Sequence, residues 1–207
     1  MPVHLIEHPL VQDALATLRD ARTGPDAFRQ TARRISVLLA IEALRDLPTI
    51  ETTVDTPLET ASVRRVGADV VVVPVLRAGL GMLDAVLELV PGARVGHLGL
   101  QRDERTAVAS KYYSKLPPSL RASYVLMVDP MLATGGSAVS GLDLLLAAGA
   151  ANVRIVCIVS APEGIAALHD AHPEIEIFTP AVDRELNAQK FILPGLGDFG
   201  DRLYGTI

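Results

Sequence analysis

The sequence predicts an α/β fold, with an open, mostly parallel, twisted sheet flanked by helices. From Asp69 onward, apolar runs alternate with Gly-rich turns and helical segments. The runs are continuous in Val, Ile and Leu, as a parallel strand buried on both faces requires. The 207 residues suit one substantial domain, or one domain with an appendage. A hydrophobic content of 49% argues against a disordered chain.

The first fifty residues are expected to form a helical arm ahead of the first strong strand. The helical segment VQDALATLRDA breaks at Thr23 and Gly24, and Pro25 suits the first turn of a second helix that ends before Pro48. We expect these helices to pack on another part of the protein or on a partner subunit. The stretch from Pro48 to Arg65 alternates only weakly, which suggests short strands at an edge.

The remaining chain divides into units that each begin with an apolar strand. These units are DVVVVPVL before RAGLG and the helical MLDAVLELV, ARVGHLGL before a polar segment, ASYVLMVD before PMLATGGS and the helical AVSGLDLLLAAGA, and NVRIVCIVSA before the helical EGIAALHDAH. No internal repeat, low-complexity tract or linker interrupts them. We therefore expect a single domain over residues 1–207.

Composition excludes several functional classes. Lys and Arg number 19 against 24 Asp and Glu, and the net charge of −5 argues against a nucleic-acid surface, which needs clustered cations. Aromatic residues make up only 4%, which disfavours a base-stacking platform. The longest stretch without Asp, Glu, Lys or Arg runs over the 13 residues from Pro130 to Leu142, shorter than the ~18 of a membrane span. No membrane partner is expected.

Cysteine and histidine usage favours a cytoplasmic protein without a metal site of its own. Cys157 lies in an apolar run and is expected to be a small core residue. The five histidines are scattered without the spacing of metal ligands. The start, MPVHLIEHPL, lacks the basic and apolar regions of a secretory signal.

Ligands of open α/β sheets bind at the carboxyl ends of the strands. One strand ends at Asp129, and Thr134-Gly135-Gly136-Ser137 then opens a helix. Glycines let the backbone approach a ligand, and free N–H groups at a helix start can surround a phosphate. An ordinary turn with Ser137 or a neighbour as N-cap is the alternative. The segment has neither a Gly-Lys-Ser/Thr P-loop ending nor GxGxxG.

Two further segments are candidates. Arg77 follows a buried strand and precedes Ala78-Gly79, so its guanidinium fork would reach a phosphate at the sheet edge; the alternative is a solvated surface arginine. The segment FILPGLGDFGDRLYGT is a Gly/Pro loop with accessible main-chain groups. Its alternative role is a C-terminal loop that packs on the sheet.

The segment VLMVDPMLATGGS resembles the 5-phosphoribosyl 1-diphosphate (PRPP) signature of the phosphoribosyltransferases. With Pro130 in place of a second acid, it is similar to the uracil phosphoribosyltransferase branch in particular. The resemblance extends in the family's order over HPLVQDALATLRD, RDLP, VVVPVLRAGLGMLD, RVGHLGLQRDE, YYSKLP and LPGLGDFGDRLYGT. It therefore covers nearly the whole chain.

The resemblance implies a type I phosphoribosyltransferase-like fold, with a helical arm over residues 1–50 and a uracil-binding hood over residues 180–207. It also implies roles for individual residues. Arg77, Arg102 and Asp198 are the catalytic set; PRPP contacts are Arg77, Arg102, Asp129, Pro130, Met131, Leu132, Ala133, Thr134, Gly135, Gly136, Ser137 and Asp198; uracil contacts are Ile192, Gly197, Asp198 and Phe199.

The implied reaction transfers the phosphoribosyl group of PRPP to uracil, forming UMP and diphosphate. Mg²⁺ is expected to enter bound mainly to PRPP. Because GTP activates some relatives, the resemblance also implies GTP as an activating ligand. A homodimer or homotetramer is expected as the assembly. Phe199 stands where the family usually has Ala, and an inward ring would narrow the pocket. The polar stretch from Asp103, which would form a flap, departs from the family at Ala109-Ser110-Lys111.

Two rival functions remain open at this point. One is a PRPP-sensing, RNA-binding regulator of pyrimidine genes on the same scaffold. The excess of acidic residues disfavours it. The other is a phosphoribosyltransferase for another nucleobase, such as hypoxanthine or adenine, whose base pocket would use different segments.

Overall fold

The fold is an α/β arrangement around one large sheet, as the sequence predicts. The computed structural model describes residues 3–102 and 109–206. The sheet has eight strands in the order β1-β12-β10-β8-β4-β6-β7, with β5 also paired to β4. Its strands are β1 (Val3–Leu5), β4 (Asp69–Leu76), β5 (Arg94–Val95), β6 (His97–Arg102), β7 (Ala109–Lys115), β8 (Ser123–Val128), β10 (Asn152–Val156) and β12 (Glu176–Thr179). Every neighbouring pair is parallel except β6 with β7.

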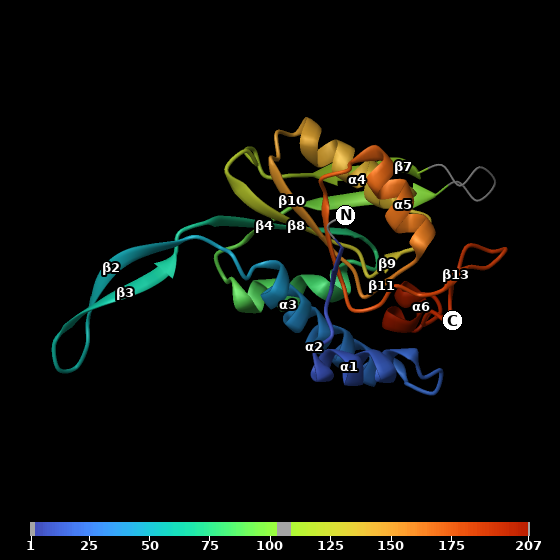
Figure 1. The fold of residues 1–207 in the computed structure, drawn as a ribbon, viewed down its shortest axis with the longest axis horizontal. Helices are drawn as coiled ribbons and strands as arrows, with labels where there is room; N and C mark the ends of the chain where they lie inside the picture. The colour runs from blue at the N-terminus through green and yellow to red at the C-terminus, as the bar shows by residue number, and fades with distance from the viewer. Residues whose placement is uncertain (1–2, 103–108, 207) are drawn as a thin grey trace.

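Helices cover both faces of this sheet (Figure 1). The helices on one face are α1 (Pro9–Arg19), α2 (Pro25–Ala43) and α3 (Leu80–Leu89); those on the other are α4 (Gly136–Ala147) and α5 (Pro162–Ala171). Alternate residues of β4 enter the two cores, with Val70 and Val72 in the first and Val71 and Val73 in the second. Burial on both faces explains why the strand is apolar throughout.

The N-terminal helices form as expected and pack on the sheet of their own chain. Residues of α1 and α2 share a buried core with strand residues such as Val72 and Val128. The chain begins with β1, which pairs in parallel with β12 at the sheet edge. The sequence analysis did not predict this strand, because three residues show too little pattern.

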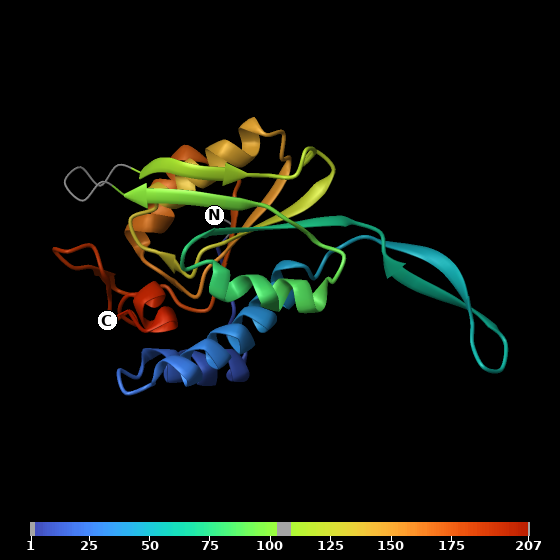
Figure 2. The same ribbon diagram turned by 180° about the vertical axis from the view of Figure 1, so that it is seen from behind.

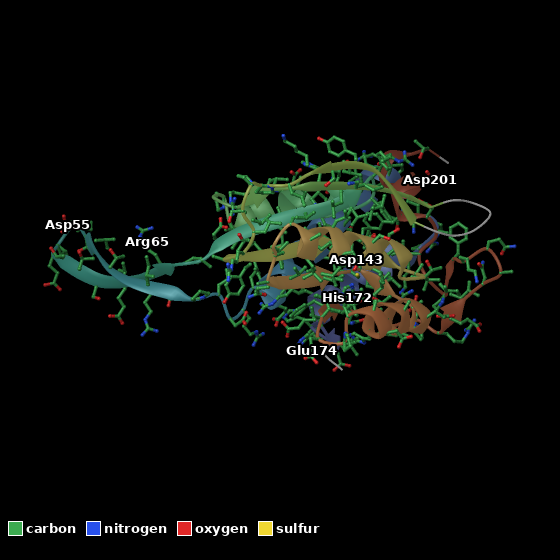
Figure 3. The ribbon with its side chains drawn as sticks, turned by 90° about the horizontal axis from the view of Figure 1, so that it is seen from above. Asp55, Arg65, Asp143, His172, Glu174 and Asp201 are labelled. Atoms are coloured by element: carbon green, nitrogen blue, oxygen red, sulfur yellow. The ribbon has the colours of Figure 1, made fainter. Side chains whose placement is uncertain are left out.

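The predicted edge strands between Pro48 and Arg65 are a correction to the sequence analysis. β2 (Thr49–Asp55) and β3 (Thr60–Val66) form a two-stranded antiparallel sheet of their own. This hairpin projects from the body of the molecule, as Figures 2 and 3 show; Asp55 and Arg65 mark it in Figure 3. The register places Ile50, Val54, Ala61 and Val63 on one face and mostly Thr, Ser and charged residues on the other, and the hairpin forms no part of the large sheet.

The strand order places a switch point between β4 and β8. From β4 the chain continues to β6 on one side, and from β8 it continues to β10 on the other. Pro74 pairs with Val128 across this boundary, so Arg77 and Asp129 emerge at the same sheet edge. Ligands of open α/β sheets bind in the crevice at such a point.

The C-terminal segment completes this end of the molecule. It contains the two-residue strands β13 (Glu185–Leu186) and β14 (Ile192–Leu193), which pair with each other, and the short helix α6 (Phe199–Tyr204). Two short strands beside the crevice, β9 (Met131–Leu132) and β11 (Val159–Ser160), also pair. Over residues 3–102 and 109–206, no helix combines the length and apolar character needed to cross a membrane.

Candidate active site

A glycine turn connects β9 with α4. Gly135 has φ of 81°, in the left-handed region that favours glycine. A Cβ at Gly135 would lie 2.8 Å from the Gly164 carbonyl oxygen and 2.9 Å from the Ala167 Cβ, both on α5. The turn can therefore pack on α5 only as glycine. The first amides of α4 lack acceptors within the helix and present positive dipoles to an anion.

Thr134 strengthens the case for a ligand in this turn. Its Oγ1 atom is buried and has no hydrogen-bond partner among the described residues. A buried hydroxyl without a partner is costly, so a ligand oxygen would satisfy it. Gly135 is the N-cap of α4, and no side chain caps the helix. Ser137 therefore does not cap the helix, and its neighbour Gly135 stands at the N-cap position.

Asp129 lies at the carboxyl end of β8, as predicted. Its backbone N–H donates to the Val156 carbonyl at 3.2 Å, and its Oδ1 accepts from the Met131 N–H at 3.3 Å. These bonds fix the carboxylate beside the glycine turn. Cys157 lies close by but is fully buried, and burial, followed by the charge of Asp129, raises the pKa of its thiol. Cys157 is thus a core residue, as expected.

Arg77 follows β4 on a loop that packs tightly on the end of β8. A Cβ at Gly79 would lie 2.5 Å from the Val128 carbonyl oxygen, so glycine permits this close approach. The Leu76–Arg77 peptide bond is cis. The Arg77 side chain is 63% exposed, and its Nη2 lies 3.8 Å from Oδ1 of Asp201.

Arg102 is the last residue of β6, which is paired in parallel with β4. Its side chain lies outside the described part of the chain, as do residues 103–108 of the predicted flap, which runs from Asp103 to Pro117. Its predicted contact with diphosphate stays a prediction. Ala109-Ser110-Lys111 begin β7, which returns antiparallel to β6.

One cavity of ≈ 260 Å³ is lined by all three predicted segments. Ala78 comes from the Arg77 loop, Met131 and Ala133 come from the segment after Asp129, and the C-terminal loop supplies the rest. The lining residues of that loop are Ile192, Gly197, Asp198, Phe199 and Gly200. The structure therefore brings together segments more than a hundred residues apart in sequence.

Phe199 does not narrow this cavity with its ring. The side chain is 1% exposed and packs edge-on against Phe28 of α2, with ring centroids 5.1 Å apart. Phe199 stands where the family usually has Ala, and its ring lies in the core. Asp198 is the N-cap of α6, and its Oδ1 accepts from the Asp201 N–H at 2.9 Å.

Gln189, Lys190 and Phe191 also line the cavity, from the turn between β13 and β14. They lie within the hood predicted over residues 180–207, and Phe191 begins the candidate segment FILPGLGDFGDRLYGT, but none of the three was among the expected contact residues. Asn187 closes this turn, because its Oδ1 accepts from the N–H groups of Gln189 at 3.0 Å and Phe191 at 2.9 Å. An Asn followed by polar residues before a short apolar pair is a turn signal that could have indicated this hairpin.

Arg202 anchors the C-terminal loop to α1. Its guanidinium donates to the carbonyls of Leu196 at 2.8 Å and Asp20 at 2.7 Å, and also to the Leu18 carbonyl. The guanidinium lies over the Phe28 ring, with Cζ 4.5 Å from the centroid. Burial lowers the pKa of Arg202. Arg202 thereby joins the C-terminal loop to the end of α1.

Fold and site together define a phosphoribosyltransferase. One switch point of the parallel sheet carries three features: the acid at the end of β8, the glycine turn before α4 and the arginine loop after β4. A solved adenine phosphoribosyltransferase from Leishmania donovani shares the fold, with a TM-score of 0.57 at 16% identity, covering 91% of this chain and 86% of that one.

The chain belongs to the uracil phosphoribosyltransferase family, whose model matches residues 5–206. Uracil phosphoribosyltransferase of Symbiobacterium thermophilum is 49% identical over 99% of this chain and 98% of its own length. That of Rhodococcus jostii is 50% identical over the same shares. A solved structure, the AQ2163 protein from Aquifex aeolicus, has a TM-score of 0.93 at 38% identity, covering 98% of this chain and 97% of that one.

Proposed function

We propose that the cavity beside β4 and β8 is where this uracil phosphoribosyltransferase converts uracil and PRPP into UMP and diphosphate. The reaction forms the bond between uracil N1 and C1 of the ribosyl group, breaks the bond from C1 to the diphosphate oxygen, and releases the N1 proton of uracil to solvent. The observation that carries the assignment is that one cavity is lined by Ala78 next to Arg77, by Met131 and Ala133 between Asp129 and the glycine turn, and by the C-terminal loop.

Positioning and charge neutralisation are the tasks of the protein in this reaction. Bond breaking at C1 builds positive charge on the sugar and negative charge on the leaving diphosphate. Arg77 and Arg102 neutralise the diphosphate. The amides from Ala133 to Ser137 and the Thr134 hydroxyl hold the 5′-phosphate, and Asp129 accepts from the ribose hydroxyls. Thr134 Oγ1, which is buried and lacks a partner within the described part of the chain, supports this placement of the phosphate.

Uracil is recognised by the backbone of the C-terminal loop. Its two carbonyl oxygens accept hydrogen bonds and its N3–H donates one, which main-chain groups at Ile192 and from Gly197 to Phe199 can match. The amino group of cytosine would face a donor there. A mismatch of this kind leaves buried polar groups unpaired, so the discrimination is strong. The core position of the Phe199 ring leaves its main chain available to the base.

Mg²⁺ bound to PRPP supplies further positive charge at the diphosphate. The residues present fit such an ion, because the carboxylates of Asp129 and Asp198 are oxygen donors of the kind Mg²⁺ prefers. Among the described residues, no cluster of three or more His, Cys, Asp or Glu side chains could hold a metal alone.

A homodimer or homotetramer is the proposed assembly. The projecting hairpin supports it, because Leu58 at its turn is 95% exposed and Ile50 and Val66 are also exposed. Light scattering of the full chain tests the assembly. GTP as an activator and the cytoplasm as the location stay predictions; initial rates with and without GTP test the former.

Radiolabelled uracil conversion, run beside a panel of other nucleobases with PRPP, tests the proposed activity. We expect product with uracil and little with cytosine, hypoxanthine or adenine. A gel-shift assay at physiological salt tests the rival RNA-binding regulator. RNA binding without uracil conversion would overturn the proposed function, and preferred conversion of a purine would overturn the assigned base.

A further inference from the structure

The helix α6 contacts both the main chain and the side chain of Arg77. Tyr204 Oη donates a hydrogen bond to the backbone carbonyl of Arg77 at 3.2 Å. The Arg77 guanidinium lies beside the Tyr204 ring, with Cζ 5.9 Å from the centroid. Asp201, labelled in Figure 3, places its Oδ1 3.8 Å from the Arg77 Nη2. The two residues that make these contacts are 124 and 127 positions away from Arg77 (201 − 77 and 204 − 77).

The helix that carries Tyr204 is itself fixed. Arg29 of α2 donates to the Leu203 carbonyl at 3.0 Å, and the Leu203 side chain is buried. Thr206 Oγ1 donates to Asp201 Oδ1 at 2.7 Å. Burial raises the pKa of the Tyr204 phenol, so the hydroxyl keeps the proton that it donates. The hydrogen bond to Arg77 therefore starts from a rigid support.

Arg77 needs such a support to act on a ligand. Its side chain is 63% exposed on a loop, and an exposed arginine loses much rotamer freedom when it is held in one place. A hydrogen bond to its carbonyl fixes the backbone from which the guanidinium projects. The same helix is capped by Asp198, so it also joins the Arg77 loop to the loop proposed for uracil.

We propose that Tyr204 is a positioning residue, whose hydroxyl fixes the loop that presents Arg77 to the diphosphate of PRPP. This role rests on the proposed function, which assigns Arg77 to the diphosphate. Tyr204 does not touch the reacting atoms. Its effect should therefore appear in PRPP affinity and leave the uracil KM unchanged.

The test compares Tyr204→Phe with the unmodified chain. The variant keeps the ring and removes only the hydroxyl. We expect PRPP affinity, measured by titration calorimetry with MgCl₂, to fall about fivefold, as for the loss of one hydrogen bond. The KM for uracil and the thermal midpoint should stay at their original values. Tyr124→Phe serves as the control. It also removes a phenolic hydroxyl, but at the start of β8, the opposite end of the sheet from Arg77.

The same substitution in an Arg77→Ala background separates positioning from a general structural role. The Arg77 carbonyl and its bond to Tyr204 persist there, but no guanidinium remains to be placed. We expect Tyr204→Phe to leave PRPP affinity of that background unchanged. No loss in the single variant, or an equal loss in both backgrounds, would overturn the positioning role. Normal PRPP affinity in Arg77→Ala alone would instead overturn the diphosphate assignment of the proposed function.

Discussion

Arg19 and Asp183 form a two-point ion pair beneath the C-terminal loop. Arg19 Nη1 and Nη2 donate to the two carboxylate oxygens of Asp183 at 2.8 and 2.7 Å. Gly195 closes the network, because its N–H donates to Asp183 Oδ2 at 2.8 Å and its carbonyl accepts from Arg19 Nη1 at 2.7 Å. The Asp183 side chain is only 7% exposed. The last residue of α1 thus fixes the loop that leads to the proposed uracil contacts.

Arg19→Ala is expected to destabilise the protein and to weaken uracil binding. The substitution leaves a buried carboxylate without its charged partner, which costs about 3 kcal/mol of unfolding free energy. The loosened Gly195 loop should raise the KM for uracil more than that for PRPP. Urea denaturation and steady-state kinetics measure the two effects. Arg22→Ala, at an exposed pair with Asp20, is the control and should change neither. Equal rises in the two KM values would contradict the loop assignment.

Arg77→Ala is expected to weaken PRPP use far more than uracil use. Removing a group that neutralises the leaving diphosphate should lower kcat/KM for PRPP by about 100-fold or more. Arg77→Lys keeps the charge but loses the planar guanidinium that can donate two parallel hydrogen bonds. Its kcat/KM for PRPP should therefore lie between that of the unmodified chain and that of Arg77→Ala. Initial rates at varied PRPP and varied uracil give the comparison. Equal losses for both substrates would remove Arg77 from its assigned role.

Asp198→Asn is expected to cripple turnover in a folded protein. Asn caps a helix about as well as Asp, so α6 should remain and the thermal midpoint should hold. The lost carboxylate charge should lower kcat about 100-fold. Asp26→Asn changes an acid in the first turn of α2 and serves as the control. Near-normal kinetics of Asp198→Asn would place this residue outside the site.

The apolar strands allowed much of the candidate site to be located from sequence. The continuous apolar runs before Arg77 and Asp129 indicate parallel strands, and the carboxyl ends of parallel strands meet at one edge of a sheet. Glycines at positions 135 and 136 likewise marked the turn before α4. These inferences depend only on local pattern and on one general property of α/β sheets.

The missed features depend on contacts that no local pattern shows. β13 and β14 have two residues each, too few to show an alternating pattern, so Gln189 and Lys190 were not placed at the cavity. The hydrogen bond from Tyr204 to Arg77 joins residues 127 positions apart (204 − 77). The hairpin of β2 and β3 carries most of its apolar side chains on one face, and this weak alternation could not show whether the hairpin joined the large sheet.

Gly135→Ala is expected to weaken PRPP binding through a displaced turn. Alanine would be strained at this left-handed backbone conformation. Its Cβ would also lie only 2.8 Å from the Gly164 carbonyl oxygen. We expect the KM for PRPP to rise about tenfold or more, since small displacements of a binding group are costly. Gly149→Ala is the matched control, with φ of 88° and no heavy atom within 4 Å of the new Cβ. Equal changes in PRPP KM for the two variants would contradict the close-packing argument.

Asp46→Asn is expected to reduce the dependence of stability on acid pH. The bidentate hydrogen bonds from Arg154, at 2.5 and 2.6 Å, lower the pKa of Asp46 below its ordinary 3.8. A carboxyl whose pKa is lowered by folding contributes stability above its unfolded pKa and loses it as pH falls through the folded one. The variant should therefore be less stable at pH 7, and its deficit should shrink below about pH 4. Urea denaturation from pH 7 to pH 2.5 measures this, with Asp13→Asn on α1 as the control for a lost charge. A deficit that stays constant with pH, or one matched by the control, would refute the contribution of this ion pair.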